Sequence, residues 1–213
     1  MRQEPPRDIG AARRYAAAMV ALRKHAPTRM SLDEFLAWDS RDPAGRTWQL
    51  IDGEPVAMAP ANTTHAALQA EIAAVLRNHL LAQGSPCQVQ SQPGIVPRLR
   101  ANRNFRVPDL GVTCAPPQAA PMMPEPVLLI EILSPSNEAE TRANIWAYST
   151  IPSVTEILAV HATRIEAELL RRQTTGGWPQ EPETIGPHGT LELRSVGFSV
   201  ALAALYRTTA LKG

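Results

Sequence analysis

A short run, residues 127–133, constrains the fold of this 213-residue chain more than any other feature. Its sequence is Val-Leu-Leu-Ile-Glu-Ile-Leu, so only Glu131 interrupts a continuous apolar segment. A run this short and this apolar is typical of a β-strand that is covered on both faces. Such a strand lies inside a sheet with helices packed against it, which favours a layered α/β protein.

The remaining patterns predict a strand-rich mixed α/β domain with at least two helices. Apolar positions in residues 63–83 recur with the period of a helix, and Gly84 ends it. A second helix is expected to follow Ser134 and to end near Tyr148. An Asp-Gly turn within residues 48–58 is typical of a β-hairpin. Further strands are expected at residues 88–96, 105–114, 154–160, 165–171 and 190–194.

The chain is expected to form one domain with a short N-terminal extension. Residues 8–25 are rich in alanine and arginine and predict a helix that Pro27 ends. We therefore assign residues 1–29 to a helical extension and residues 30–213 to a single folded domain. The proline-rich segment 115–126 is expected to be a surface connection inside that domain.

Composition excludes two classes of protein. The chain has no stretch of about 18 consecutive apolar residues, which excludes an integral membrane protein. The N-terminus lacks the apolar segment of a signal peptide, so we expect a cytoplasmic protein. A net charge of +1 argues against a protein that coats nucleic acid through bulk electrostatics, but it leaves room for a local basic groove.

The two cysteines, Cys87 and Cys114, are too few for a cysteine zinc cluster or a disulfide-rich miniprotein. Neither belongs to a Cys-x-x-Cys pair. Because disulfides are rare in cytosolic proteins, we expect both residues to be free thiols.

Two carboxylates interrupt predicted strands that are otherwise apolar. Asp109 lies in the strand expected at 105–114, and Glu131 lies in the strand expected at 127–133. A buried carboxylate is costly unless it is paired or bound to a cation. Carboxylates on neighbouring strands can share one hard divalent ion, for which Mg²⁺ is the usual choice. The alternative is that nearby arginines neutralise them; these are Arg98, Arg100, Arg103 and Arg106.

The same residues carry a resemblance to known nucleases. Val107-Pro108-Asp109, followed by Ile130-Glu131-Ile132-Leu133, resembles the signature of the PD-(D/E)XK nuclease superfamily, which has the restriction-endonuclease-like fold. More narrowly, the chain resembles the Uma-type restriction endonuclease family from about residue 31 to residue 205. The motifs that carry this resemblance are Leu50-Ile51-Asp52-Gly53-Glu54, His65, residues 107–109, residues 130–136, and Tyr148 with Ile151-Pro152.

The resemblance implies a central mixed β-sheet flanked by helices, with a site that hydrolyses phosphodiester bonds of nucleic acid, DNA being the expected substrate. Asp109 and Glu131 would be ligands of Mg²⁺, or of Mn²⁺ in its place. Glu54 and His65 would lie near the metal. Packing within the apolar stripe of the helix is an equally good interpretation of His65. Cleavage of both strands would favour a homodimer.

The chain departs from these families at the catalytic lysine. The superfamily position is Leu133, and the Uma-type position, four residues before the tyrosine, is Asn144. Glu140, Asn144 and Tyr148 share a helix face through their i, i+4 spacing. A neutral amide cannot stabilise developing negative charge as an ammonium does. We therefore expect weak cleavage or none, and a lysine restored at position 144 is expected to raise the rate.

Three functions stay open at this stage. The first is an Mg²⁺-dependent endonuclease in which Asp109, Glu131, Glu54 and Asn144 form the catalytic set. The second is a weakened or inactive nuclease-fold protein that binds nucleic acid or a protein partner without cutting. The third is an unrelated role on the same fold. In the first two, the four arginines within residues 98–106 are expected to contact nucleic acid.

Overall fold

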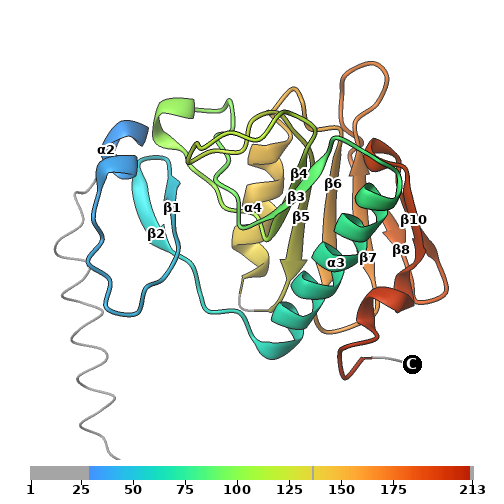
Figure 1. Cartoon of the computed structure of the whole chain (residues 1–213). Helices are drawn as coiled ribbons and strands as arrows, with labels where there is room; N and C mark the ends of the chain where they lie inside the picture. The colour runs from blue at the N-terminus through green and yellow to red at the C-terminus, as the bar shows by residue number, and fades with distance from the viewer. Residues whose placement is uncertain (1–28, 136, 212–213) are drawn as a thin grey trace, which may run out of the picture.

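A six-stranded sheet forms the centre of the computed structural model, which describes residues 29–135 and 137–211 (Figure 1). β5 and β6 run parallel and the other neighbouring pairs run antiparallel, so the sheet is mixed, as predicted. In sheet order, the strands are β3 (Gln88–Ser91), β4 (Leu110–Thr113), β5 (Pro126–Leu133), β6 (Glu156–His161), β7 (Ala167–Arg171) and β8 (Glu183–Ile185).

β5 is the covered central strand that its apolar sequence predicts. Its side chains at positions 128, 130 and 132 pack into a core shared with α3 (Thr63–Ala82). Its side chains at 129 and 133 pack into a second core shared with α4 (Glu138–Tyr148). Because side chains alternate along a strand, Glu131 projects toward α4. In Figure 1, the two helices flank β5.

Polar residues fix the start of both helices. Asn62 caps α3, and its side-chain oxygen accepts a hydrogen bond from the backbone N–H of His65. Before α4, the side-chain oxygen of Asn137 accepts hydrogen bonds from the backbone N–H and the hydroxyl of Ser134. These contacts set the N-terminal ends of α3 and α4 near the end of β5.

The first part of the described chain forms a small unit beside the main sheet. It contains α2 (Leu32–Ala37), β1 (Trp48–Ile51) and β2 (Glu54–Ala57). The two strands form a hairpin with a sheet of its own, as the Asp-Gly turn predicts. Backbone hydrogen bonds in both directions between Leu50 and Phe105 link this hairpin to the rest of the fold. The unit lies apart from the six strands in Figure 1.

The last part of the chain covers the far end of α3. β9 (Thr190–Leu193) and β10 (Phe198–Ala201) pair as a hairpin, and the 3₁₀ helix η3 (Leu202–Tyr206) follows. Their buried residues join the same core as α3. Two further 3₁₀ turns are η1 (Ala101–Arg103) and η2 (Arg194–Val196). The sequence patterns predicted β9 but not β8 or β10.

The strands expected at 88–96 and 105–114 are shorter in the structure. Pro93 and Pro108 have no N–H to donate, and the named strands stop before the first and begin after the second. Asp109 therefore directly precedes β4 instead of lying within a strand.

The expectation of two free thiols was wrong. Cys87 and Cys114 are joined by a disulfide bond. They directly flank the paired residues Gln88 and Thr113 of the antiparallel strands β3 and β4, so the strand register sets them opposite each other. Spacing along the sequence does not reveal that register.

The N-terminal extension is largely outside the part of the chain that the structure describes. The helix expected at residues 8–25, and the extension 1–29 apart from its last residue, lie outside the described residues. Within residues 29–135 and 137–211, no helix has the length and apolar character needed to cross a membrane.

Candidate active site

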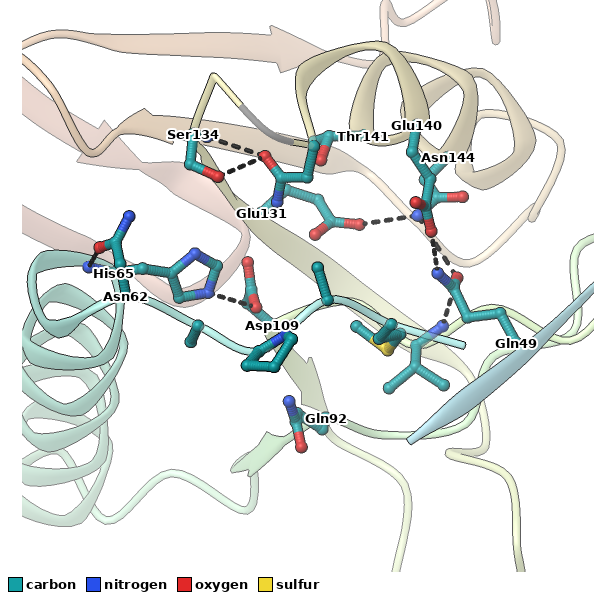
Figure 2. Close-up of a pocket in the computed structure, with 16 residues that line it drawn as sticks. Gln49, Asn62, His65, Gln92, Asp109, Glu131, Ser134, Glu140, Thr141 and Asn144 are labelled. Carbon is teal, nitrogen blue, oxygen red and sulfur yellow. Dashed lines mark hydrogen bonds and ion pairs between the residues drawn. The ribbon is translucent and has the colours of Figure 1, made fainter. Parts of the chain in front are cut away.

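A polar pocket lies between the end of β5 and the start of α4 (Figure 2). Its volume is about 120 Å³. Side chains reach it from β1, from the start of α3, from the segment before β4, from β5 and from α4. Those that define its chemistry are Gln49, His65, Asp109, Glu131, Glu140 and Asn144.

Strand register brings the two carboxylates of the pocket together. Leu110 pairs with Ile130 in the antiparallel pairing of β4 and β5. Continued by one residue, this register sets Asp109 opposite Glu131. Side chains that lie directly opposite in such a pair have Cβ atoms about 4.5–5.5 Å apart. Both carboxylates are buried and both line the pocket.

Asp109 is held at both carboxylate oxygens. Its Oδ1 lies 2.8 Å from Nε2 of His65, and its Oδ2 accepts a hydrogen bond of 2.7 Å from the backbone N–H of Ile132. Its backbone carbonyl accepts a further bond of 2.8 Å from Nε2 of Gln69 on α3. The side chain therefore has a fixed direction, toward the pocket in Figure 2.

Glu131 is held by two residues of α4 and by the backbone of Asp109. Its Oε1 accepts hydrogen bonds from the hydroxyl of Tyr148, at 2.7 Å, and from Nδ2 of Asn144, at 3.4 Å. The backbone of Asp109 also donates a hydrogen bond to this carboxylate. Burial and the nearby charge of Asp109 raise the pKa of Glu131 well above its usual range. Burial, followed by the charge of Glu131, likewise raises the pKa of Tyr148.

His65 takes part in the site and is not only a packing residue. It is buried near the start of α3, and its side chain meets the carboxylate of Asp109. The capping bond from Asn62 fixes its backbone. Both interpretations of this histidine were open from the sequence, and the structure brings it into the pocket.

Gln49 connects the hairpin to α4 and is a site residue that the sequence patterns missed. Its Nε2 donates to Oε1 of Glu140 at 2.6 Å, and its Oε1 accepts from the backbone N–H of Val107 at 3.1 Å. Nδ2 of Asn144 lies 3.4 Å from the same Oε1. The only signal in the sequence was a buried polar residue between Trp48 and Leu50 in a strand.

Glu54 does not reach the pocket, contrary to expectation. It is exposed at the start of β2, where it pairs with Ile51 next to the hairpin turn. The hairpin residue that lines the pocket is Gln49, whose partner in the hairpin is Val56.

Three of the four predicted nucleic-acid-binding arginines lie away from the pocket. Arg98, Arg100 and Arg103 are exposed around η1. Arg100 forms an ion pair of 2.9 Å with Asp52. The backbone N–H of Arg98 donates to the hydroxyl of Thr150, beyond the C-terminal end of α4.

The fourth arginine, Arg106, is not on the surface. Its residue is only 6% exposed. Its guanidinium donates to Oδ1 of Asn144 at 3.1 Å and to Oδ1 of Asn104 at 3.0 Å. A group enclosed in this way cannot contact a phosphate at the surface. Ile95 pairs with it in a backbone bridge, which turns its side chain into the fold.

The donor set of the pocket fits a hard divalent cation. Asp109 and Glu131 supply carboxylate oxygens, which Mg²⁺ and Mn²⁺ prefer, and both residues line the same pocket. A cation here would offset the repulsion that raises the pKa of Glu131. The alternative from the sequence was arginine neutralisation. No arginine of the described residues forms an ion pair with either carboxylate.

A second group of candidate ligands lies on β6 and β7. Atoms of His161, Glu166 and Glu168 lie within 4.8 Å of one another. Arg142 binds both oxygens of Glu168, and Arg164 donates to Glu166 at 2.6 Å. The arginines already supply the positive charge, so this group is an ion-pair network that joins α4 to the sheet.

Comparison with known proteins assigns the chain to a family. A family model named Uma2, described as "Putative restriction endonuclease", matches residues 32–203. The chain belongs to the Uma2 family. This confirms the resemblance seen in the sequence motifs, and the matched range includes every pocket residue named above.

Two relatives of this Uma2 chain extend the comparison. The uncharacterized protein slr1290 of Synechocystis is 28% identical over 193 residues, which cover 89% of this chain and 98% of that protein. The crystal structure of a "putative nuclease" from Anabaena variabilis matches with a TM-score of 0.67 and 19% identity, over 83% of this chain and 97% of that one. The second match confirms the predicted fold.

Proposed function

We propose that this protein is an Mg²⁺-dependent endonuclease that hydrolyses phosphodiester bonds of DNA, with Mn²⁺ as an alternative cofactor. One observation carries the proposal: two buried carboxylates, Asp109 and Glu131, face one pocket. Membership of a family described as "Putative restriction endonuclease" supports the same reaction class.

Each pocket residue has a separate role in this proposal. Asp109 and Glu131 would hold the cation, which when bound lowers the pKa of a coordinated water and neutralises charge on the attacked phosphate. His65 keeps the carboxylate of Asp109 turned into the pocket. Tyr148 and Asn144 hold Oε1 of Glu131 and thereby fix the direction of its carboxylate.

The direct test is cleavage of supercoiled plasmid DNA with Mg²⁺ or Mn²⁺, and with a chelator in place of either metal. Asp109→Asn and Glu131→Gln keep the side-chain shapes but remove the charges, and each should lower the rate at least about a hundredfold. Glu192→Gln is the matched control, because Glu192 is an exposed carboxylate on β9. Cleavage that persists in both charge-removing variants would contradict the proposal.

A second candidate function is DNA or protein binding without cleavage. Asn144, which occupies the position of the family lysine, favours it, because an amide carries no charge. Fluorescence anisotropy with labelled DNA, measured on the same preparations, separates the two. Binding without cleavage by the wild type supports the second candidate. Cleavage that depends on Asp109 supports the first.

DNA contacts are proposed for the exposed arginines around η1. Arg98 and Arg103 form no ion pair with described residues, so both are free to meet phosphates. Replacing both with glutamine should reduce the slope of log affinity against log salt by about 2, because two fewer counterions are released. An unchanged slope would remove this surface from the proposal. We also propose a homodimer for cleavage of both strands, which sedimentation equilibrium tests.

A further inference from the structure

Arg106 is a buried cation that forms no direct ion pair within the described part of the chain. Its NH1 and NH2 groups donate to two neutral amide oxygens, Oδ1 of Asn144 and Oδ1 of Asn104. Its Nε is buried and has no hydrogen-bond partner in the described chain. No carboxylate of the described residues lies within ion-pair distance of it. The charges of Asp52 and Glu140 act on the guanidinium without direct contact.

Burying an unpaired charge is expensive, and a guanidinium stays protonated under ordinary conditions. A neutral side chain would fill the same space without that cost. Hydrogen bonds connect Arg106 to acidic groups through the two asparagines. Glu131 is connected to it through Asn144, and Asp52 through Asn104.

Arg106 also sets the orientation of the Asn144 amide. A guanidinium only donates hydrogen bonds, so the carbonyl oxygen of Asn144 must face it. The amide nitrogen is thereby turned the other way, toward Oε1 of Glu131 and Oε1 of Gln49. Figure 2 shows this nitrogen directed at Glu131. In this wall of the pocket, the amide nitrogen of Asn144 is the hydrogen-bond donor. The positive charge of Arg106 lies on the opposite side of the same amide.

We propose that Arg106 and Asn144 together replace the missing lysine, with Arg106 as a positioning residue that acts through Asn144. Asn144 donates its hydrogen bonds to Glu131 and Gln49, and Arg106 orients the amide and supplies the positive charge. This inference rests on the proposed nuclease function. It also changes the effect expected of a lysine at position 144. Asn144→Lys would bring a second cation next to Arg106, and the two positive charges would repel each other.

The test measures two quantities in Arg106→Gln, which keeps an amide donor but removes the charge. Mg²⁺ affinity, measured by calorimetry without DNA, should rise about tenfold because a nearby cation no longer repels the metal. The cleavage rate at saturating Mg²⁺ should fall at least about tenfold. A merely structural defect would weaken both. Arg106→Lys keeps the positive charge, so its Mg²⁺ affinity and cleavage rate should lie closer to the wild-type values than those of Arg106→Gln. Arg77→Gln is the control, because Arg77 is an exposed arginine on α3.

A second pair of variants tests the charge without removing Arg106. Asn144→Asp keeps the side-chain shape and pairs directly with the guanidinium, so Mg²⁺ should bind more tightly while cleavage falls. Asn144→Lys should exceed wild-type cleavage only when it is combined with Arg106→Gln, which leaves one cation. Unchanged Mg²⁺ affinity and cleavage in Arg106→Gln would overturn the inference. If Asp109→Asn cleaves as wild type does, the nuclease proposal itself fails.

Discussion

Glu131 shows how single contacts can decide the chemistry of a buried carboxylate. Tyr148 and Asn144, both on α4, occupy one oxygen of the carboxylate, while strand geometry directs the whole group into the pocket. Burial and the charge of Asp109 oppose its ionisation. The hydrogen bond from the hydroxyl of Tyr148 is the shortest that Glu131 accepts. Removing this hydroxyl changes the shape of the site least.

Tyr148→Phe should lower the free energy of unfolding by about 2 kcal/mol, because it leaves Oε1 of Glu131 buried with a weaker set of partners. Urea denaturation of the metal-free protein measures this change. The phenyl ring of the variant would fill nearly the same volume as the tyrosine ring, so the slope of the transition should stay constant. An unfolding free energy equal to that of the wild type would show that the hydroxyl contributes nothing to the fold.

At the level of elements, α4 is fixed to the sheet through charge as well as through apolar packing. Arg142 binds both carboxylate oxygens of Glu168 on β7, and His161 on β6 contacts the same carboxylate. These hydrogen bonds, the one from Arg142 above all, hold the pKa of Glu168 below its ordinary value. Because α4 carries Asn144 and Glu140, this attachment also positions one wall of the pocket.

The lowered pKa of Glu168 predicts a specific pH dependence. A carboxyl whose folded pKa lies below its unfolded pKa of 4.5 stabilises the fold above pH 4.5 and loses that contribution as pH falls through the folded value. Wild type should therefore lose more stability on acidification below about pH 5 than Glu168→Gln. Urea midpoints measured at a series of pH values provide the comparison. Parallel curves for the two proteins would contradict it.

The disulfide connects an edge strand to its neighbour. Cys87 and Cys114 are separated by 27 positions, and closing a loop of that size in the unfolded chain contributes about 3 kcal/mol. The Cys87→Ser, Cys114→Ser double variant should be less stable than the oxidised protein by about that amount. A reducing agent should lower the midpoint of unfolding of the wild type but not that of the double variant. A reductant effect of equal size on the variant would point to another cause.

The sequence predicted the central elements and failed at contacts between distant segments. β5 and α3 follow from apolar periodicity, which local packing enforces. The approach of Asp109 to Glu131 follows from two neighbouring strands. Gln49 could not be assigned, because its partner Glu140 is 91 positions away and nothing local indicates the pairing. The burial of Arg106 was equally hidden, since an arginine in a loop-to-strand segment usually faces solvent.

At the scale of the whole molecule, the pocket is shared between the main sheet and the small N-terminal unit. β5 lies between two cores. The β1–β2 hairpin contributes Gln49 but pairs with no strand of the main sheet. Only a few backbone hydrogen bonds join the hairpin to the rest of the described chain, including those between Leu50 and Phe105.

The two sides of the pocket should therefore differ in hydrogen exchange. Amide protons of β5 are expected to exchange only through global unfolding, whereas those of the hairpin exchange through local opening, which costs much less free energy. Hydrogen–deuterium exchange followed by mass spectrometry resolves the two segments. Equal protection would mean that the hairpin and the sheet open as one unit. If they open separately, the side of the pocket that carries Gln49 fluctuates while the two carboxylates stay in place.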